Sequence, residues 1–129
     1  MNPLPNDIRL DFQERADYLY VAVSGPRDSQ DISKAYWSAI AQECQRRKTR
    51  KLMVVENLGD YEGERDLAET VDFLFEIGMD KLQVAFVVAR IELLAQMEHG
   101  EILALERGAM GRVFGSVSVA ESWLRHGAS

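Results

Sequence analysis

Two short apolar runs, each flanked by helical patterns, constrain the fold of this chain most. Residues 52–55 and 82–89 are almost wholly apolar, which is typical of strands buried on both faces of a parallel sheet. Apolar residues recur with helical spacing over residues 66–78 and again from residue 91. Parallel strands need long crossover connections, and these are right-handed almost without exception. The sequence therefore predicts an α/β domain with a mostly parallel sheet.

A β-hairpin is predicted ahead of this alternating region. Residues 8–13 alternate apolar and polar side chains, and residues 18–24 are rich in strand-forming types. The polar turn at residues 15–17 is too short for a crossover, so the two strands should pair antiparallel, with the first at an edge of the sheet. Gly25-Pro26 is expected to end the second strand.

The first long helix should begin at a cap formed by Asp28 or Ser29 and run to about Lys48. Cys44 lies on its apolar face and is interpreted as a small core residue rather than a reactive thiol. Trp37 falls off that face, so it is either an exposed anchor for a homodimer or a residue packed at the edge of the core. The predicted inward positions are Ile32, Ala35, Tyr36, Ala39, Ile40 and Cys44.

The rest of the chain predicts a second half of the same domain. Gly100 is expected to interrupt the helix that starts at residue 91, and residues 112–114 form a short last strand. Ser116 or Ser118 should cap a final helix that Gly127 ends. The predicted order is ββαβαβαβα, with a mixed sheet of about five strands and about four helices. Residues 1–6 are predicted as a flexible tail and residues 7–127 as one domain.

Composition excludes several classes of protein. The 129 residues are 47% hydrophobic and 28% charged, which is a globular composition. The net charge of −6 argues against nucleic acid, and the basic cluster at residues 46–51 is interpreted as a helix C-terminus. One cysteine rules out an internal disulfide and favours a reducing compartment. Because no signal peptide or run of bilayer length is evident, we expect a cytoplasmic protein without an integral membrane segment.

No catalytic, metal or cofactor site emerges from the motifs. Only two histidines are present, and His99 beside Glu98 and Glu101 lacks the converging ligands that a metal needs. No glycine-rich phosphate loop and no G-x-S-x-G elbow occur. The acidic residues that follow residue 58 are interpreted as a solvated helix face and helix start rather than paired catalytic carboxylates.

The best candidate site is a loop at residues 58–65. It follows a buried strand, and ligands in open α/β sheets meet the carboxyl ends of the parallel strands. The loop offers an aromatic side chain, two glycines and several acidic groups. We predict that it forms an interaction surface made by Asp60, Tyr61, Glu62, Gly63, Glu64 and Arg65.

Several segments together resemble the STAS domain and, more closely, the SpoIIAA-like (STAS/SEC14-type) bacterial proteins. The resemblance rests on Leu52-Met-Val-Val-Glu-Asn, on Tyr61-Glu-Gly leading into Asp66-Leu67, on Val113-Phe114, and on Ser118-Val-Ala-Glu-Ser-Trp-Leu124. It implies a STAS-like fold. In STAS regulators a serine at the start of the helix after this strand is phosphorylated. Residues 58–69 contain no serine or threonine, so this control should be absent here.

Two functions remain open. The first is a non-enzymatic regulatory or protein-interaction module that binds an unknown protein partner through residues 58–65. The relation to the lipid-binding SEC14 fold implies the second, a carrier or sensor of an apolar small molecule or lipid. In that case the pocket would be lined by Phe73, Phe75, Met79, Met97 and Met110.

Overall fold

The computed structural model describes residues 3–126 and contains one five-stranded sheet with four α-helices. None of the helices in this range is long and apolar enough to cross a membrane. The elements follow the predicted order, with one short 3-10 helix added. They are β1 (Arg9–Glu14), β2 (Leu19–Ser29), α1 (Gln30–Arg47), β3 (Lys51–Glu62), α2 (Leu67–Glu76), η1 (Met79–Lys81), β4 (Gln83–Val88), α3 (Ile91–Leu105), β5 (Met110–Phe114) and α4 (Val117–His126).

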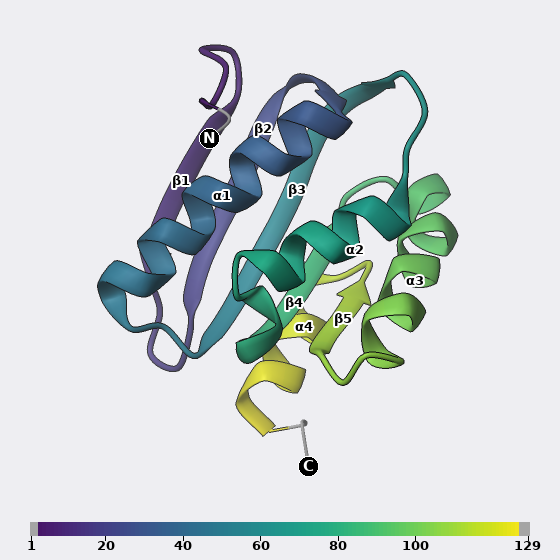
Figure 1. The fold of residues 1–129 in the computed structure, drawn as a ribbon. Helices are drawn as coiled ribbons and strands as arrows, with labels where there is room; N and C mark the ends of the chain where they lie inside the picture. The colour runs from purple at the N-terminus through teal and green to yellow at the C-terminus, as the bar shows by residue number, and fades with distance from the viewer. Residues whose placement is uncertain (1–2, 127–129) are drawn as a thin grey trace.

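The strand order in the sheet is β1-β2-β3-β4-β5. β1 pairs antiparallel with β2 at one edge, and every later pair is parallel, which confirms the predicted mixed sheet. Successive parallel strands are neighbours, so right-handed crossovers place their connecting helices on one side of the sheet. Figure 1 shows α1 and α2 crossing that side, α3 beside β5, and α4 behind the sheet.

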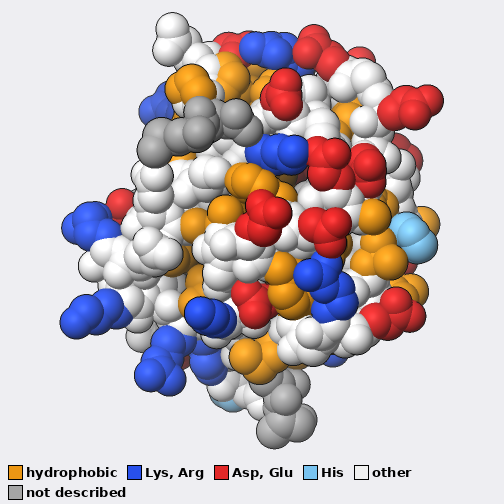
Figure 2. All heavy atoms as spheres, in the orientation of Figure 1, with side chains coloured by type: hydrophobic (Ala, Val, Ile, Leu, Met, Phe, Trp, Pro, Cys, Tyr) orange, Lys and Arg blue, Asp and Glu red, His pale blue; other side chains and the backbone are white. Residues whose placement is uncertain are grey.

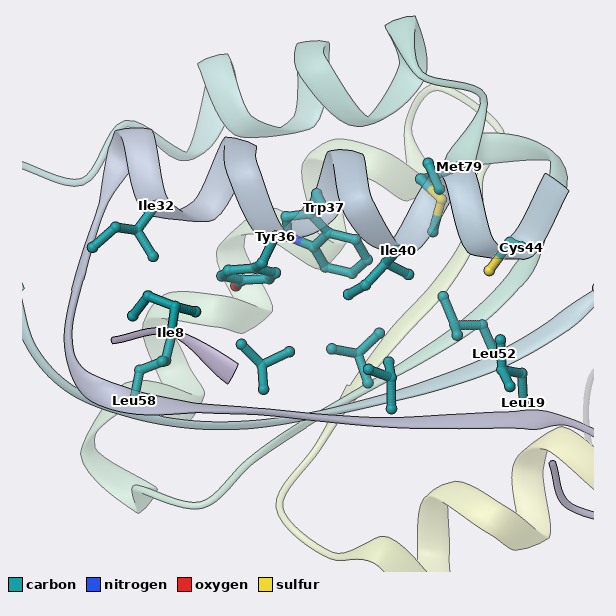
Figure 3. Close-up of a cluster of buried hydrophobic side chains, with 14 residues drawn as sticks. Ile8, Leu19, Ile32, Tyr36, Trp37, Ile40, Cys44, Leu52, Leu58 and Met79 are labelled. Carbon is teal, nitrogen blue, oxygen red and sulfur yellow. The ribbon is translucent and has the colours of Figure 1, made fainter. Parts of the chain in front are cut away.

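The main core lies between α1 and the sheet. Tyr36, Trp37 and Ile40 point from α1 toward β2 and β3 (Figure 3), and the ring of Trp37 lies 5.8 Å from that of Phe86. Trp37 is 6% exposed, so the interpretation as an exposed dimer anchor is wrong; the side chain packs within the main core rather than at its edge. The buried face of α1 is wider than the predicted stripe and includes this tryptophan.

A smaller core lies on the opposite face of the sheet, under α4. Its buried members include Met53, Ala85, Ala120 and Leu124. Because β3 contributes Leu52 and Val54 to the main core and Met53 to this one, it is buried on both faces, as its apolar sequence predicts.

β2 and β3 are longer than predicted, and the expected break at Gly25-Pro26 is wrong. β2 continues to Ser29 and pairs with β3 as far as Glu62. β1 pairs with β2 only as far as Ser24, so the far end of β2 is an edge. A proline is tolerated there because its missing N–H is not needed for a ladder hydrogen bond.

The helices begin and end close to their predicted positions. Ser29, rather than Asp28, caps α1, since its side chain accepts a hydrogen bond from Ile32 N. α3 runs unbroken through Gly100, so the predicted interruption is wrong; a helix tolerates an interior glycine at a cost of about 1 kcal/mol. Ser116 accepts a hydrogen bond from Val119 N at 3.4 Å and so caps α4, whereas Gly127 lies outside the described residues.

Cys44 and Leu4 both pack in or against the main core. Cys44 is buried, and burial raises the pKa of its thiol to about 11, as expected of a core residue. Leu4 lies within the predicted tail of residues 1–6, and it packs against the main core.

Candidate functional site

A cavity of about 140 Å³ lies between the helices and the sheet. α1 contributes Trp37, α2 contributes Val71 and Phe75, α3 contributes Met97, and β5 contributes Val113. Most of its wall is apolar, and it lies where α2 and α3 pack against the strands β4 and β5. The strand order never reverses, so the sheet has no switch point at which a ligand crevice would open. The cavity beneath the helices is partly open to solvent.

The predicted 58–65 segment forms part of this site, although it is only partly a loop. Residues 58–62 continue β3, and Gly63, with φ of +80°, turns the chain toward α2. Tyr61 and Arg65 line the cavity.

The other four members of the predicted interaction surface face away from the cavity. Glu62, Gly63 and Glu64 are exposed, and the Asp60 carboxylate, 97% exposed, lies 3.1 Å from the Arg90 guanidinium. Acidic side chains gather over α2 and the connection before it (Figure 2).

Tyr61 fixes this segment to two helices. Its hydroxyl donates a hydrogen bond to Gln30 Oε1 at 2.7 Å, and Gln30 Nε2 donates to Thr70 Oγ1 at 2.9 Å. The same Gln30 oxygen accepts from Asp66 N at 3.1 Å, at the N-cap of α2. The start of α1, the end of β3 and the start of α2 are therefore joined through one glutamine side chain.

Arg65 is the cationic side chain at this end of the cavity. Its guanidinium lies 3.9 Å from the centre of the Tyr61 ring, a stacked cation–π arrangement. The side chain is only 11% exposed, and its nearest carboxylate oxygen is Asp28 Oδ2, at 4.0 Å. That separation is an ion pair and too long for a hydrogen bond.

Two buried carboxyls, Asp28 and Glu56, lie close to Arg65, and neither is a site residue predicted from the sequence. Asp28 Oδ1 accepts from Ser29 N and from Ser33 Oγ, whereas Asp28 Oδ2 has no hydrogen-bond partner within residues 3–126. Glu56 Oε1 accepts from Leu58 N at 2.8 Å. Loss of hydration on burial raises the pKa of both carboxyls, and the charge of Asp28 raises that of Glu56 further. Neither residue lines the cavity.

Asp28→Asn is expected to become more stable relative to the parent protein as the pH rises. The folded-state pKa of Asp28 lies above its ordinary value of 3.8, so its stabilising contribution is complete below that value and is lost as the pH rises through the raised pKa. Asparagine keeps the oxygen that accepts from Ser29 and Ser33 but has no proton to lose. Urea unfolding between pH 4 and pH 7 measures the difference, with exposed Asp31→Asn as the matched control. A relative stability that falls with rising pH would show that the pKa is lowered instead.

The five residues proposed for an apolar pocket divide into two groups. Phe75, Met79 and Met97 line the cavity. Phe73 packs against the main core instead, and Met110 is 49% exposed. Within residues 3–126, no group of three or more His, Cys, Asp or Glu is placed to hold a metal ion.

Comparison with known proteins identifies the fold. No protein-family model and no curated protein matches the sequence. The chain is similar in structure to an uncharacterized protein of the DUF3478 family from Shewanella loihica PV-4, whose crystal structure is described as having a SpoIIAA-like fold. That likeness has a TM-score of 0.54, with 12% sequence identity, over 96% of this chain and 98% of the other. The five-stranded sheet with its N-terminal antiparallel hairpin and four helices is therefore a SpoIIAA-like fold.

Proposed function

We propose that this protein is a non-enzymatic regulatory module that binds a small apolar molecule in the cavity beneath α1, α2 and α3. The observation that carries the proposal is the cavity itself, about 140 Å³ with mostly apolar walls. An engineered apolar cavity of about 150 Å³ in another protein stays dry and binds benzene. A six-membered ring with one small substituent is therefore the size of ligand that this cavity suits, which favours a small molecule over a long-chain lipid.

The free energy gained by filling the cavity supports ligand binding. A closed core void costs about 24 cal/mol per Å³, so about 3 kcal/mol is an upper bound for 140 Å³ of space that is partly open to solvent. A ligand that fills the space restores contacts worth a comparable amount.

The position of residues 60–65 supports a regulatory role. Tyr61 and Arg65 contact the cavity, whereas Asp60, Glu62 and Glu64 lie exposed on the same short segment. A ligand that shifts Tyr61 or Arg65 would therefore alter an acidic surface, which suits a basic protein partner. This combines the two functions that the sequence left open, with the cavity as the sensor and the acidic segment as the surface that responds.

Toluene is expected to stabilise the protein against heat. At a free concentration of ten times its Kd, linkage gives about 1.4 kcal/mol, or a rise in Tm of about 5 °C for a domain of this size. Differential scanning calorimetry at several toluene concentrations measures the shift. Ligands of the size of cyclohexanol and ligands with an acyl chain, tested in parallel, define the largest molecule that the cavity accepts. If saturating toluene leaves Tm unchanged, the cavity does not bind apolar molecules and the proposal fails.

A further inference from the structure

The polar end of the cavity specifies which apolar molecules it should prefer. Besides its apolar wall, the cavity is lined by a few polar groups, and most of these are already engaged. The Tyr61 hydroxyl donates a hydrogen bond to Gln30, and the Ser33 hydroxyl donates one to Asp28. Thr70 Oγ1 accepts a hydrogen bond from Gln30 and donates one to Asp66 O. Glu101 accepts from Val113 N at 2.6 Å. These groups have little left to offer a ligand.

Arg65 differs from them. Its guanidinium carries five N–H donors, and its ion pair with Asp28 at 4.0 Å is too long to consume one as a hydrogen bond. One face of the guanidinium stacks on Tyr61, which leaves its edge to donate. A donor that is nearly buried and lines an apolar space is the position where a ligand acceptor gains most.

The charges around Arg65 decide whether that acceptor should be charged. Asp28 neutralises the guanidinium, and Glu56 is a second buried carboxyl nearby. A ligand carboxylate would enter beside two acidic groups that are already poorly hydrated, so repulsion and desolvation would oppose it. An uncharged hydroxyl or carbonyl oxygen avoids both costs.

We infer that the cavity is a site for a neutral aromatic molecule with a single hydroxyl or carbonyl group, which accepts a hydrogen bond from Arg65. This inference rests on the proposed function and names its ligand class. The aromatic ring would lie among Trp37, Val71, Phe75 and Met97, with its oxygen toward Arg65. Phenol is the simplest compound with these properties.

The other charged residues on the wall define competing positions for the oxygen. Asp80 belongs to η1, immediately before β4, whereas Arg65 follows the carboxyl end of β3. Because β3 and β4 are parallel, these two residues belong to opposite ends of the cavity. Arg112 places its guanidinium 5.9 Å from the centre of the Trp123 ring, toward α4 on the other face of the sheet.

Isothermal titration calorimetry with toluene, phenol and benzoate tests the inference on the full chain. Phenol is expected to bind about tenfold more tightly than toluene, because its oxygen gains a charge-assisted hydrogen bond, and benzoate at least about tenfold more weakly than phenol. Arg65→Met should abolish the preference for phenol over toluene, because it removes the donor to the ligand oxygen and keeps an apolar side chain on the wall. Arg90→Met, an arginine at the same edge of the sheet but outside the cavity, should keep the preference, as should Asp80→Asn.

The outcomes of the titrations distinguish the ligand class, the role of Arg65 and the proposed function from one another. If toluene binds and phenol binds no better, or benzoate binds best, the inference about ligand class is overturned while the proposed function stands. If Asp80→Asn, rather than Arg65→Met, removes the preference, the assignment to Arg65 is wrong. If none of the three probes binds, the proposed function itself fails. Should Arg65→Met not fold, as judged by circular dichroism, the ranking of the three probes on the parent protein still decides the matter.

Discussion

Gly59→Ala is expected to lower the free energy of unfolding by about 3 kcal/mol, at the upper end of the usual cost of overpacking. A Cβ at this position would lie 1.9 Å from Pro26 O and 2.5 Å from Pro26 C, both backbone atoms that no side-chain rotation can move aside. The ladder between β2 and β3 would have to separate at this position. Urea unfolding followed by circular dichroism measures the loss.

Gly111→Ala is the matched control, because it also places a methyl group on a strand of the same sheet. The nearest atom to its added Cβ is Val84 O, at 4.0 Å, so we expect a change of no more than about 0.5 kcal/mol. Equal costs for the two variants would contradict the close approach of β2 and β3 at Gly59.

Filling the cavity from α3 should raise stability and remove ligand binding at the same time. Gly100 lines the cavity, and a Cβ built there meets only Leu67 Cδ2, at 3.6 Å. Gly100→Ala should stabilise the helix by about 1 kcal/mol. Gly100→Leu should add about 0.8 kcal/mol for each further buried CH₂ that the cavity accepts, and should weaken toluene binding at least about tenfold. Calorimetric unfolding and toluene titration of the series measure the two effects.

Ala95→Leu separates cavity filling from a general gain in apolar surface, since Ala95 is exposed on the same helix. It should leave toluene affinity unchanged. A Gly100→Leu variant that is folded, more stable and still binds toluene as before would locate the ligand elsewhere on the protein.

Much of the fold could be predicted from the sequence because its signals are local. The apolar runs in β3 and β4, the alternation in β1 and the Ser29 cap each depend on neighbouring residues. The far end of β3 could not be predicted in this way. Leu58 packs in the main core, and Tyr61, three residues later, lies on the same side of the sheet against Gln30. A regular strand would place residues three apart on opposite faces, so the alternation of side chains is broken between these two. That change occurs beside Gly59, which resembles a loop residue in the sequence.

The candidate site was predicted in part. The rule that ligands meet the carboxyl ends of parallel strands led to residues 60–65, and two of these, Tyr61 and Arg65, do reach the cavity. The cavity itself depends on how closely α1, α2 and α3 pack together, and a helical pattern gives the inward face but not the remaining space. Asp28 was considered only as a helix cap, because its burial depends on β2 continuing through Pro26.

We expect a small apolar molecule to occupy the cavity beneath the three helices. The most direct test is an NMR measurement of intermolecular NOEs between the ring protons of toluene and protein labelled at its methionine and valine methyl groups. We expect NOEs to Met97 and Val71, which line the cavity from α3 and α2. The contrary result is a set of NOEs confined to exposed methyl groups such as those of Met110 and Val119, or none at saturating toluene.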